Sequence, residues 1–556
     1  MPPSPSLPHD SPTRAHEYDF IVIGSGFGGS VCALRLAEKG HRVLVLEQGR
    51  RFSDADFPST NWRVRDFLWM PALGLRGFLQ LTFLREVMVL HGCGVGGGSL
   101  GYANVLMEPD PEYFEDPEWR RLTDWRRDLR PHYETARRML GVVPTPELAP
   151  ADRALAEVAA EFGHGHTARP TQVGVFFGEP GVAVPDPYFG GQGPARAGCT
   201  YCGGCMVGCR YNAKNTLVKN YLYLAEQHGA EIRAETRVTG IFPLDGGYRV
   251  EARRSTRPWS RAISLRATNV VVSAGTLGTL ELLHRCRASI RSLPRLSPRL
   301  GENVRTNSEA LLGSGARRND VDYSKGLAIS SDARVDEVTH VQPVRYPAGS
   351  SFMRLLSSPL VEGRGRGPLV RLAKVMAAAA RHPLDVLRAV IGRRWAERTT
   401  ILLVMQRLES SMTIRWGRPR LPLWPAGLQA RRDPNRPAPG EIPQAHAVVR
   451  AFAARTDGVP MGNVAESLFG MSATAHLIGG CPMGESDAEG VVDRFCRVHN
   501  YPGLYVVDGT VLPANPGINP SLTITALAEY AMSHVPPRAR APGPETLRRV
   551  EATVGS

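Results

Sequence analysis

The sequence lacks several features that would place the chain in a special class. It has no run of about 18 apolar residues, the length that a membrane-spanning helix needs. Residues 1–17 are rich in Pro and Ser without the apolar core of a secretory signal, so we expect a disordered tail, a second tail at 541–556, and a cytoplasmic protein. No internal repeat is found. The 556 residues exceed what one hydrophobic core usually organises, which favours two domains.

Lysine is scarce, because only five of the 67 basic residues are Lys. The formal net charge of +14 would suit a nucleic-acid partner. No basic stretch alternates with aromatic residues as a nucleic-acid surface would, so we expect no nucleic-acid partner. We attribute the preference for Arg over Lys to the base composition of the genome rather than to a binding surface.

The nine cysteines form an odd number, which excludes complete pairing within the chain and favours a reducing compartment. Cys199, Cys202, Cys205 and Cys209 have the C-x₂-C-x₂-C-x₃-C spacing of a bacterial ferredoxin run. Arg210 stands where that run has Pro, and no second run exists. The pattern leaves open an iron–sulfur cluster on these four ligands, a zinc site, or a metal-free glycine-rich loop.

The strongest local pattern lies at residues 20–47, which read as strand, glycine turn, helix and strand. Gly24, Gly26 and Gly29 give G-x-G-x-x-G. These glycines permit a tight turn, the approach of backbone to a pyrophosphate, and close packing of helix on strand. Glu47 follows where an acid can hold a ribose hydroxyl. The pattern predicts a dinucleotide site without choosing between NAD and FAD.

Two further glycine-rich segments follow. Residues 92–101 contain six glycines, which excludes a helix and lets the backbone approach a cofactor closely. Residues 262–273 read as a strand that runs into the sequence AGTLG and a helix. This second strand–turn–helix unit is expected to belong to the same domain as the first.

The C-terminal part carries the candidate chemistry. His476 stands in a loop with the sequence HLIGGC, and residues 504–507 read as a strand before Asp508. Asn519 precedes Pro520 at the start of a helix that runs to about residue 534. The positive end of that helix would stabilise an anion formed on a bound cofactor.

The segment 368–398 is basic and has an amphipathic pattern. Leu369, Leu372, Val375 and Met376 share one helical face. Such a helix can lie peripherally on an anionic membrane surface. A packing helix with a solvated cationic face is the other interpretation.

Six motifs, in this order, resemble the glucose–methanol–choline (GMC) flavoprotein oxidoreductases, and among them the cholesterol-oxidase-like branch. They are GSGFGGS with Glu47, GVGGGSL with Glu108-Pro109, AKNTLVKNYL, SAGTLGTLELL, HLIGGC, and VVDGTVLPANPGINPSLTITALAE. The resemblance extends from residue 18 to about residue 535.

This resemblance implies an α/β fold (α+β overall) with one non-covalently bound FAD. The Rossmann-like FAD-binding domain would be discontinuous, comprising 18–110, 191–310 and 470–540. The inserted substrate-binding or cap domain would comprise 111–190 and 311–469, with an antiparallel sheet and helices. The implied reaction removes the hydroxyl proton of a bulky, lipid-like alcohol and passes hydride to flavin N5. A sterol is the first candidate for this alcohol. Oxygen would be the electron acceptor, or another acceptor if the cysteine run held a cluster.

The resemblance also assigns residues. His476 and Asn519 would be catalytic, since neutral imidazole is a suitable base near neutral pH. The implied cofactor-binding residues are Gly24, Gly26, Gly29, Glu47, Gly96, Gly97, Gly98, Ser99, Val238, Asp508, Gly509, Asn519 and Ser521.

One departure from the branch concerns the steroid double bond. Cholesterol oxidases carry a glutamate before a Pro-Ala-Gly turn, and it acts as the base that moves the double bond. Here the turn is residues 347–349, and Gln342 stands at the corresponding position. A neutral amide cannot act as that base, so we do not expect isomerisation.

Overall fold

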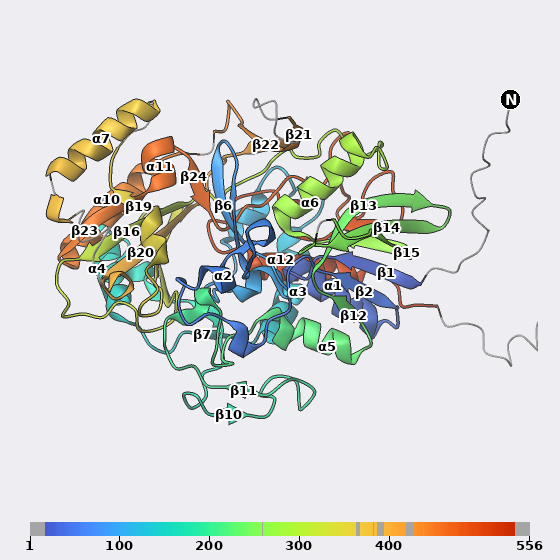
Figure 1. The fold of residues 1–556 in the computed structure, drawn as a ribbon, viewed down its shortest axis with the longest axis horizontal. Coiled ribbons are helices and arrows are strands. Elements are labelled where there is room, and N and C mark those ends of the chain that lie inside the picture. The colour runs from blue at the N-terminus through green and yellow to red at the C-terminus, as the bar shows by residue number, and fades with distance from the viewer. Residues whose placement is uncertain are drawn as a thin grey trace, which may run out of the picture.

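The computed structural model describes residues 17–539 apart from 258, 363–366, 382, 386–393, 419–425 and 438. The tails expected at 1–17 and 541–556 therefore lie outside the described residues except for Glu17. Two large sheets lie side by side in Figure 1, one to the right around β1 and one to the left around β16. The observed mixture of a Rossmann-like sheet and a second antiparallel sheet is the predicted α/β fold class.

The first sheet has a parallel core and an antiparallel extension. Its order is β12-β2-β1-β15-β14-β13, and β25 pairs with the C-terminal half of β15. The contacts among β12, β2, β1, β15 and β25 are parallel, whereas β13, β14 and the first half of β15 are antiparallel. The bounds are β1 Tyr18–Ile23, β2 Val43–Leu46, β12 Glu231–Arg233, β13 Thr236–Leu244, β14 Gly247–Arg254, β15 Ile263–Val272 and β25 Leu504–Val506.

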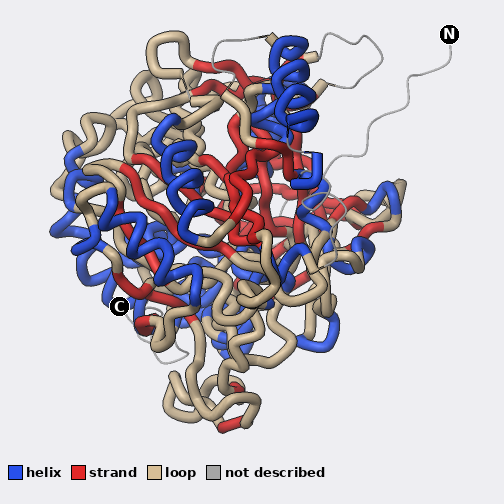
Figure 2. The backbone as a smooth tube through the Cα atoms, turned by 90° about the vertical axis from the view of Figure 1, so that its left-hand side faces the viewer, coloured by secondary structure: helices blue, strands red, loops and turns tan. Residues whose placement is uncertain are grey.

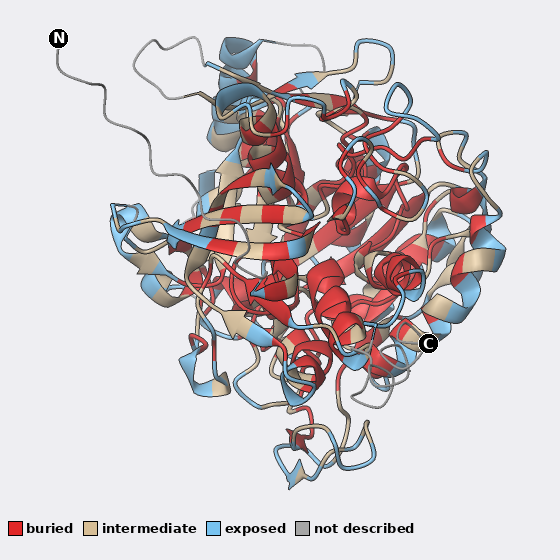
Figure 3. Cartoon of the chain, turned by 90° about the vertical axis from the view of Figure 1, so that its right-hand side faces the viewer, coloured by how far each residue is buried: buried red, intermediate tan, exposed pale blue. Residues whose placement is uncertain are grey.

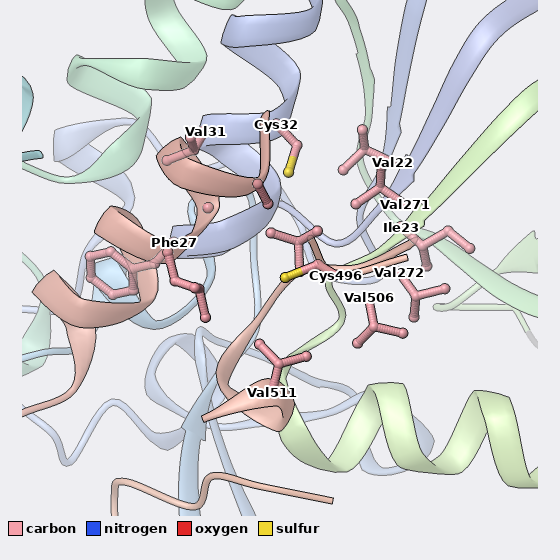
Figure 4. Packing of buried hydrophobic residues seen from close by; sticks show 14 of the residues in the cluster. Val22, Ile23, Phe27, Val31, Cys32, Val271, Val272, Cys496, Val506 and Val511 are labelled. Atoms are coloured by element: carbon pink, nitrogen blue, oxygen red, sulfur yellow. The ribbon is translucent and has the colours of Figure 1, made fainter. Parts of the chain in front are cut away.

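Helices cover both faces of this sheet, which explains why its parallel strands are continuous apolar runs. Figure 4 shows Val22, Val271 and Val506 of neighbouring strands side by side, with Cys32 on the side of helix α1 that faces them. Full burial of each such aliphatic side chain contributes about 1.5–3 kcal/mol. The covering helices are α1 (Phe27–Glu38), α3 (Trp125–Leu140), α5 (Tyr221–Gln227), α6 (Gly275–His284) and α12 (Ser521–Ser533).

Helix α3 lies in the range expected for the substrate domain, but it packs against the cofactor side. Its stripe of Trp125, Leu129 and Tyr133 is buried in the core around the first sheet. The Tyr133 hydroxyl also donates to Thr523 Oγ1 of α12 at 2.9 Å. The reason is the spacing of large apolar residues along one face of α3, which complements α12.

The second sheet is antiparallel, with the order β19-β23-β16-β20-β18-β17-β8. Alternation along β20 divides its two faces: Leu402 and Val404 pack against α10, whereas Ile401 and Leu403 face a cavity. The bounds are β8 Arg169–Pro170, β16 Ala310–Ala316, β17 Ser331–Arg334, β18 Thr339–Val344, β19 Ser357–Pro359, β20 Thr399–Gln406, β23 Gly458–Asn463, α4 Pro150–Glu161 and α10 Pro443–Arg455.

The remaining elements connect or extend the two sheets. Figure 2 shows the second sheet (red strands) with helices around it, and the short β10–β11 hairpin projects at the bottom of Figures 1 and 2. Buried residues fill the interior of the molecule in Figure 3. These elements are α2 Val64–Phe67, β3 Trp69–Met70, β4 Leu75–Arg76, β5 Leu79–Phe83, β6 Val87–Gly92, β7 Val142–Pro144, β9 Gln172–Gly174, β10 Ala183–Val184, β11 Arg196–Ala197, α7 Pro368–Arg381, α9 Trp395–Arg398, β21 Met412–Gly417, β22 Gly427–Arg432, α11 Val464–Phe469 and β24 Ser472–Thr474.

None of the helices in the described part of the chain is both long enough and apolar enough to cross a membrane.

Candidate active site

A cavity of about 360 Å³ lies between the two sheets and takes its walls from both. At one end are glycine-rich backbone segments that include Gly26, Gly98 and Gly509. At the other end are apolar side chains of the second sheet and of α9, including Leu403 and Trp395. A site of this kind combines a backbone-lined cofactor region with an apolar substrate region.

Three helices begin at this cavity. Phe27 of α1, Gly275 of α6 and Ser521 of α12 each start their helix and each line the cavity wall. The N-terminus of a helix carries partial positive charge and free N–H groups, so the cavity favours anionic groups such as a pyrophosphate or a reduced flavin. The residues present therefore fit FAD. The second strand–turn–helix unit of the sequence supplies α6, although we had not predicted its residues 274–278 as part of the site.

The predicted glycine motifs pack against each other. A Cβ on Gly97, whose φ is +52°, would lie 2.7 Å from Gly26 Cα. Gly24 has φ +98°, and a Cβ there would lie 2.2 Å from Ser273 O. Ser99 fixes the second glycine loop, because its hydroxyl donates to Gly96 O at 2.7 Å and accepts from Leu217 N at 3.0 Å. A dinucleotide turn this close to a second backbone segment leaves no room for side chains.

Glu47 directly follows β2 and is buried. Burial raises the pKa of its carboxyl, while hydrogen bonds from Gly49 N (2.8 Å) and the Ser25 hydroxyl (2.8 Å) oppose that shift. Through the hydrogen bond from Ser25, Glu47 stabilises the first glycine turn. Its contact with an adenosine ribose remains a prediction.

Asp508 connects α6 to the segment before α12. Its carboxylate accepts from Thr279 Oγ1 at 2.5 Å and from Thr510 N at 2.9 Å. Burial raises the pKa of this carboxyl, and the three hydrogen bonds from Thr279 and Thr510 offset part of the rise.

The structure divides the predicted site residues into two groups. Those that line the cavity are Gly26, Gly98, His476, Asp508, Gly509, Asn519 and Ser521. Those that lie behind this wall are Gly24, Gly29, Glu47, Gly96, Gly97, Ser99 and Val238. Any direct contact of the second group with the cofactor stays a prediction.

His476 and Asn519 meet at the junction of the two ends of the cavity. Asn519 Nδ2 lies 3.4 Å from His476 Nε2. Asn519 Oδ1 is buried and has no hydrogen-bond partner among the described residues. The loop after β24 carries the histidine and the N-terminus of α12 carries the asparagine, so two predicted residues from separate elements come together here. A base beside an unsatisfied amide oxygen suits a substrate hydroxyl.

Glu309 is the functional residue that the sequence reasoning missed. It precedes β16, its side chain is fully buried, and its Oε1 accepts a hydrogen bond from His476 Nδ1. No motif surrounds it, and it lies 167 positions from the histidine. The one available signal was an acidic residue directly before the apolar run at residues 310–312, since a carboxylate buried with such a run needs a partner.

The cysteine run forms a compact loop beside the site. Cys199, Cys202, Cys205 and Cys209 are free thiols that line a second, small cavity of about 20 Å³. Burial raises the pKa of Cys199 to about 12 and that of Cys205 to about 11, so both thiols stay protonated at neutral pH. No group of three or more His, Cys, Asp or Glu side chains within the described ranges could hold a metal ion. The described residues therefore give no support to an iron–sulfur cluster or a zinc site on these four cysteines.

Gln342 lies on the same face of the second sheet as Leu403, with which it pairs across β18 and β20, but it does not line the cavity. Its Nε2 donates to Asp332 Oδ1 at 3.1 Å, and the same carboxylate contacts the ring of His340 at 3.1 Å. Burial alone would lower the pKa of His340, but the Asp332 and Asp110 carboxylates outweigh it and raise that pKa to about 9. Gln342 therefore belongs to a buried charge network of β17 and β18.

Comparison with known proteins supports this geometry. Two GMC oxidoreductase family models match residues 195–306 and 437–528, and a model of NAD(P)-binding Rossmann-like domains matches residues 22–58. A cholesterol oxidase of Mycobacterium tuberculosis is 48% identical over 96% of this chain and 94% of its own length. A cholesterol oxidase of Acinetobacter baumannii is 43% identical over 94% of this chain and 95% of its own.

Among solved structures, a pyridoxine 4-oxidase from "Mesorbium loti" has a TM-score of 0.58 at 18% identity and covers 93% of this chain and 99% of its own. That likeness shows the fold alone. The identities above 40% over nearly the whole chain settle the family. The chain belongs to the GMC oxidoreductase family, in its cholesterol-oxidase-like branch, and is an enzyme that acts on CH–OH donors.

Proposed function

We propose that this enzyme oxidises the hydroxyl of a bulky, lipid-like alcohol, with a 3-hydroxysterol as the first choice, to the ketone. The observation that carries this proposal is the cavity itself, in which His476 and Asn519 lie between a glycine-lined end and an apolar end. The names of the two cholesterol oxidase relatives favour the same substrate class.

The apolar end of the cavity suits a rigid hydrocarbon. Leu311, Ile401 and Leu403 of the second sheet line it together with Met461 and Trp395. Burial of a sterol ring system against such a wall contributes roughly 25 cal/mol for each Å² of apolar surface removed from water. The same wall excludes water from the place where the hydroxyl would react.

The polar end would direct the reaction. His476 Nε2 accepts the hydroxyl proton of the substrate, and Asn519 orients the oxygen by a side-chain hydrogen bond. Bound FAD supplies the hydride-accepting flavin. The first glycine turn, the segment 274–278 and the N-terminus of α12 are the parts of the chain that would hold the cofactor, through backbone N–H groups and helix ends.

Dioxygen is the electron acceptor that we propose, because the two relatives above are named oxidases. The test is oxygen consumption and peroxide formation with cholesterol, a long-chain primary alcohol and ethanol, with the products identified by mass spectrometry. We expect a ketone from the sterol with one peroxide per turnover. Flavin reduction without oxygen consumption would reject the acceptor, and an inert sterol would reject the substrate.

We also propose that a 5-ene-3β-hydroxysterol leaves the enzyme mainly as the unisomerised ketone. Gln342 has no carboxylate, its amide donates to Asp332, and the residue does not line the cavity. Glu309, the carboxylate paired with His476, has a fully buried side chain.

A membrane contact through α7 is the final part of the proposal. Of the predicted apolar face, Leu369, Leu372 and Met376 are 82%, 46% and 62% exposed, while Arg371 is the buried residue of the helix. Arg371 Nη1 donates to Glu466 O of α11, so the helix packs through its arginine and presents its apolar face outward. Exposed Lys374 and Arg381 suit anionic head groups. Residues 382 and 386–393 of the predicted segment lie outside the described residues.

A further inference from the structure

The Glu309 carboxylate is surrounded by hydrogen-bond donors. Its Oε1 accepts from His476 Nδ1 and faces Asn307 Nδ2 at 3.4 Å. Its Oε2 accepts from Ala475 N at 2.9 Å. Ala475 N and Asn307 Nδ2 can only donate, so His476 Nδ1 is the one of these three neighbours that could accept a proton from a protonated carboxyl. Three donors around two oxygens are the arrangement that suits a buried carboxylate anion.

This anion determines which nitrogen of His476 carries the proton. Since Glu309 accepts at Nδ1, that nitrogen is the donor, and the lone pair lies on Nε2. Nε2 is the atom that faces Asn519 Nδ2, itself a donor. The tautomer that Glu309 selects therefore has its lone pair on Nε2, and this nitrogen can accept a proton from a hydroxyl in the cavity.

We propose that Glu309 is a positioning residue for His476, which fixes the Nδ1-protonated tautomer and compensates the positive charge that the ring gains when it accepts the substrate proton. The proposal rests on the proposed oxidation of an alcohol at His476. A buried carboxylate behind a catalytic imidazole stabilises the imidazolium without taking the proton itself.

The segment that carries Glu309 also fixes the position of Asn519, the second proposed catalytic residue, through hydrogen bonds to the residues before it. Asn307 Nδ2 donates to Ile518 O at 3.1 Å, and Gly517 N donates to Asn307 Oδ1 at 3.0 Å, which fixes the loop in front of Asn519. Asn307 itself has φ +56°, a left-handed backbone that the surrounding contacts must stabilise.

The same segment is tied to the histidine loop through the main chain. Arg305 and Ile478 exchange backbone hydrogen bonds of 2.8 and 3.0 Å, and Thr474 Oγ1 donates to Thr306 O at 3.0 Å. Residues 305–309 therefore connect the loop of His476 to the loop of Asn519 and fix the position of one side chain relative to the other.

A purely structural role for Glu309 is the alternative, in which it only secures the loop through Ala475 N. The two roles differ in the protonation state of the ring. We would record ¹⁵N spectra of histidine-labelled holoenzyme and assign His476 from the His476→Gln variant. We expect an Nδ1-protonated ring in the wild type and a mixture of tautomers in Glu309→Gln. This readout needs no substrate, so it stays informative even if the proposed function fails.

The kinetic arm uses Glu309→Gln, Glu309→Asp and a matched control. We expect Glu309→Gln to lower kcat about 100-fold with KM within about threefold and FAD retained, and Glu309→Asp to restore part of the loss because the charge remains. Glu466→Gln is the control, since Glu466 Oε1 lies 2.8 Å from the ring of His446 in another buried Glu–His pair. Neither residue lines the cavity, so kcat should stay within about twofold of the wild type.

Two results would overturn the proposal. One is a wild-type His476 ring protonated at Nε2, which can be measured even if Glu309→Gln does not fold. The other is a folded Glu309→Gln enzyme with wild-type kcat. If no alcohol reduces the flavin of the wild type while the expected tautomer is found, the proposed function fails and the fixed tautomer stands.

Discussion

The two sheets differ in how directly the sequence determines them. On the cofactor side, a short strand, a glycine turn and a helix follow one another within residues 18–38, and close packing such as that of Gly97 on Gly26 makes the glycines obligatory. On the substrate side, β19, β23 and β16 pair although about 150 residues of chain separate β16 from β23. The first strand–turn–helix unit of the cofactor half is set by local geometry, although β15 and β25 join it from distant parts of the chain. The substrate half depends throughout on long-range packing and buried charge. We therefore expect substitutions in the cofactor half to reduce FAD binding and substitutions in the substrate half to reduce the stability of the fold.

The largest effect is expected where the two halves meet. His476→Ala should lower kcat about 1,000-fold while FAD stays bound, because the base is lost but the helix ends and glycine turns remain. Turnover per mole of bound flavin is the measurement. A variant with wild-type kcat on the oxidised alcohol would show that another group takes the proton.

On the cofactor side, Gly97→Val should reduce the FAD content of the purified enzyme at least about tenfold, because both the positive φ and the contact with Gly26 oppose a side chain. Turnover per bound flavin should change little. Gly163→Val is the matched control, since Gly163 has φ +83° with open space around it. Equal loss of FAD in both variants would mean that backbone strain alone is responsible.

On the substrate side, Gln342→Glu should destabilise the fold by about 2–4 kcal/mol without creating isomerase activity. The new carboxylate would lie against Asp332, which already accepts from Gln342 Nε2, at a position that does not line the cavity. Denaturant unfolding measures the first effect, and the absorbance of the conjugated enone measures the second. Rapid enone formation by the variant would refute this account of Gln342.

The charge network of the substrate side should make stability depend on pH. The pKa of His340 is about 9 in the folded protein against about 6.5 unfolded, so its contribution is complete below about pH 6.5 and is lost as the pH rises through 9. The free energy of unfolding of the wild type should therefore fall by on the order of 2–3 kcal/mol relative to His340→Gln over that window. Parallel curves for the two proteins would show that His340 is neutral when folded.

The smallest effect concerns the outer surface. Leu372→Ser should weaken binding to anionic phospholipid vesicles about three- to tenfold, because one exposed apolar side chain of α7 is removed. Activity on detergent-dispersed substrate should be unchanged. Trp259→Ser, at another exposed apolar residue, 82% exposed, is the control. The membrane contact is contradicted if both variants bind vesicles as the wild type does.

The sequence predicted the features that rest on local patterns. The strands and glycine turns around Gly24 and Gly275, the start of α12, and the placement of His476 with Asn519 were all expected, and the family is confirmed. Glu309 was missed because its partner is distant in sequence and no spacing rule connects them. The outward apolar face of α7 could not be predicted, since helical periodicity shows that two faces differ but not which one packs. The residue that decided it is Arg371, whose buried side chain donates to Glu466 O and so places its own side of the helix against α11.

The most direct test of the central claim is anaerobic reduction of the bound flavin by a panel of alcohols, followed by its loss of absorbance. The account predicts that 3-hydroxysterols bleach the flavin at least about 100-fold more efficiently than short primary alcohols, because only a bulky hydrocarbon fills the apolar end of the cavity. A sterol carrying deuterium at C3 should react more slowly, since hydride leaves that carbon. Bleaching by short alcohols alone, with sterols inert, would contradict it.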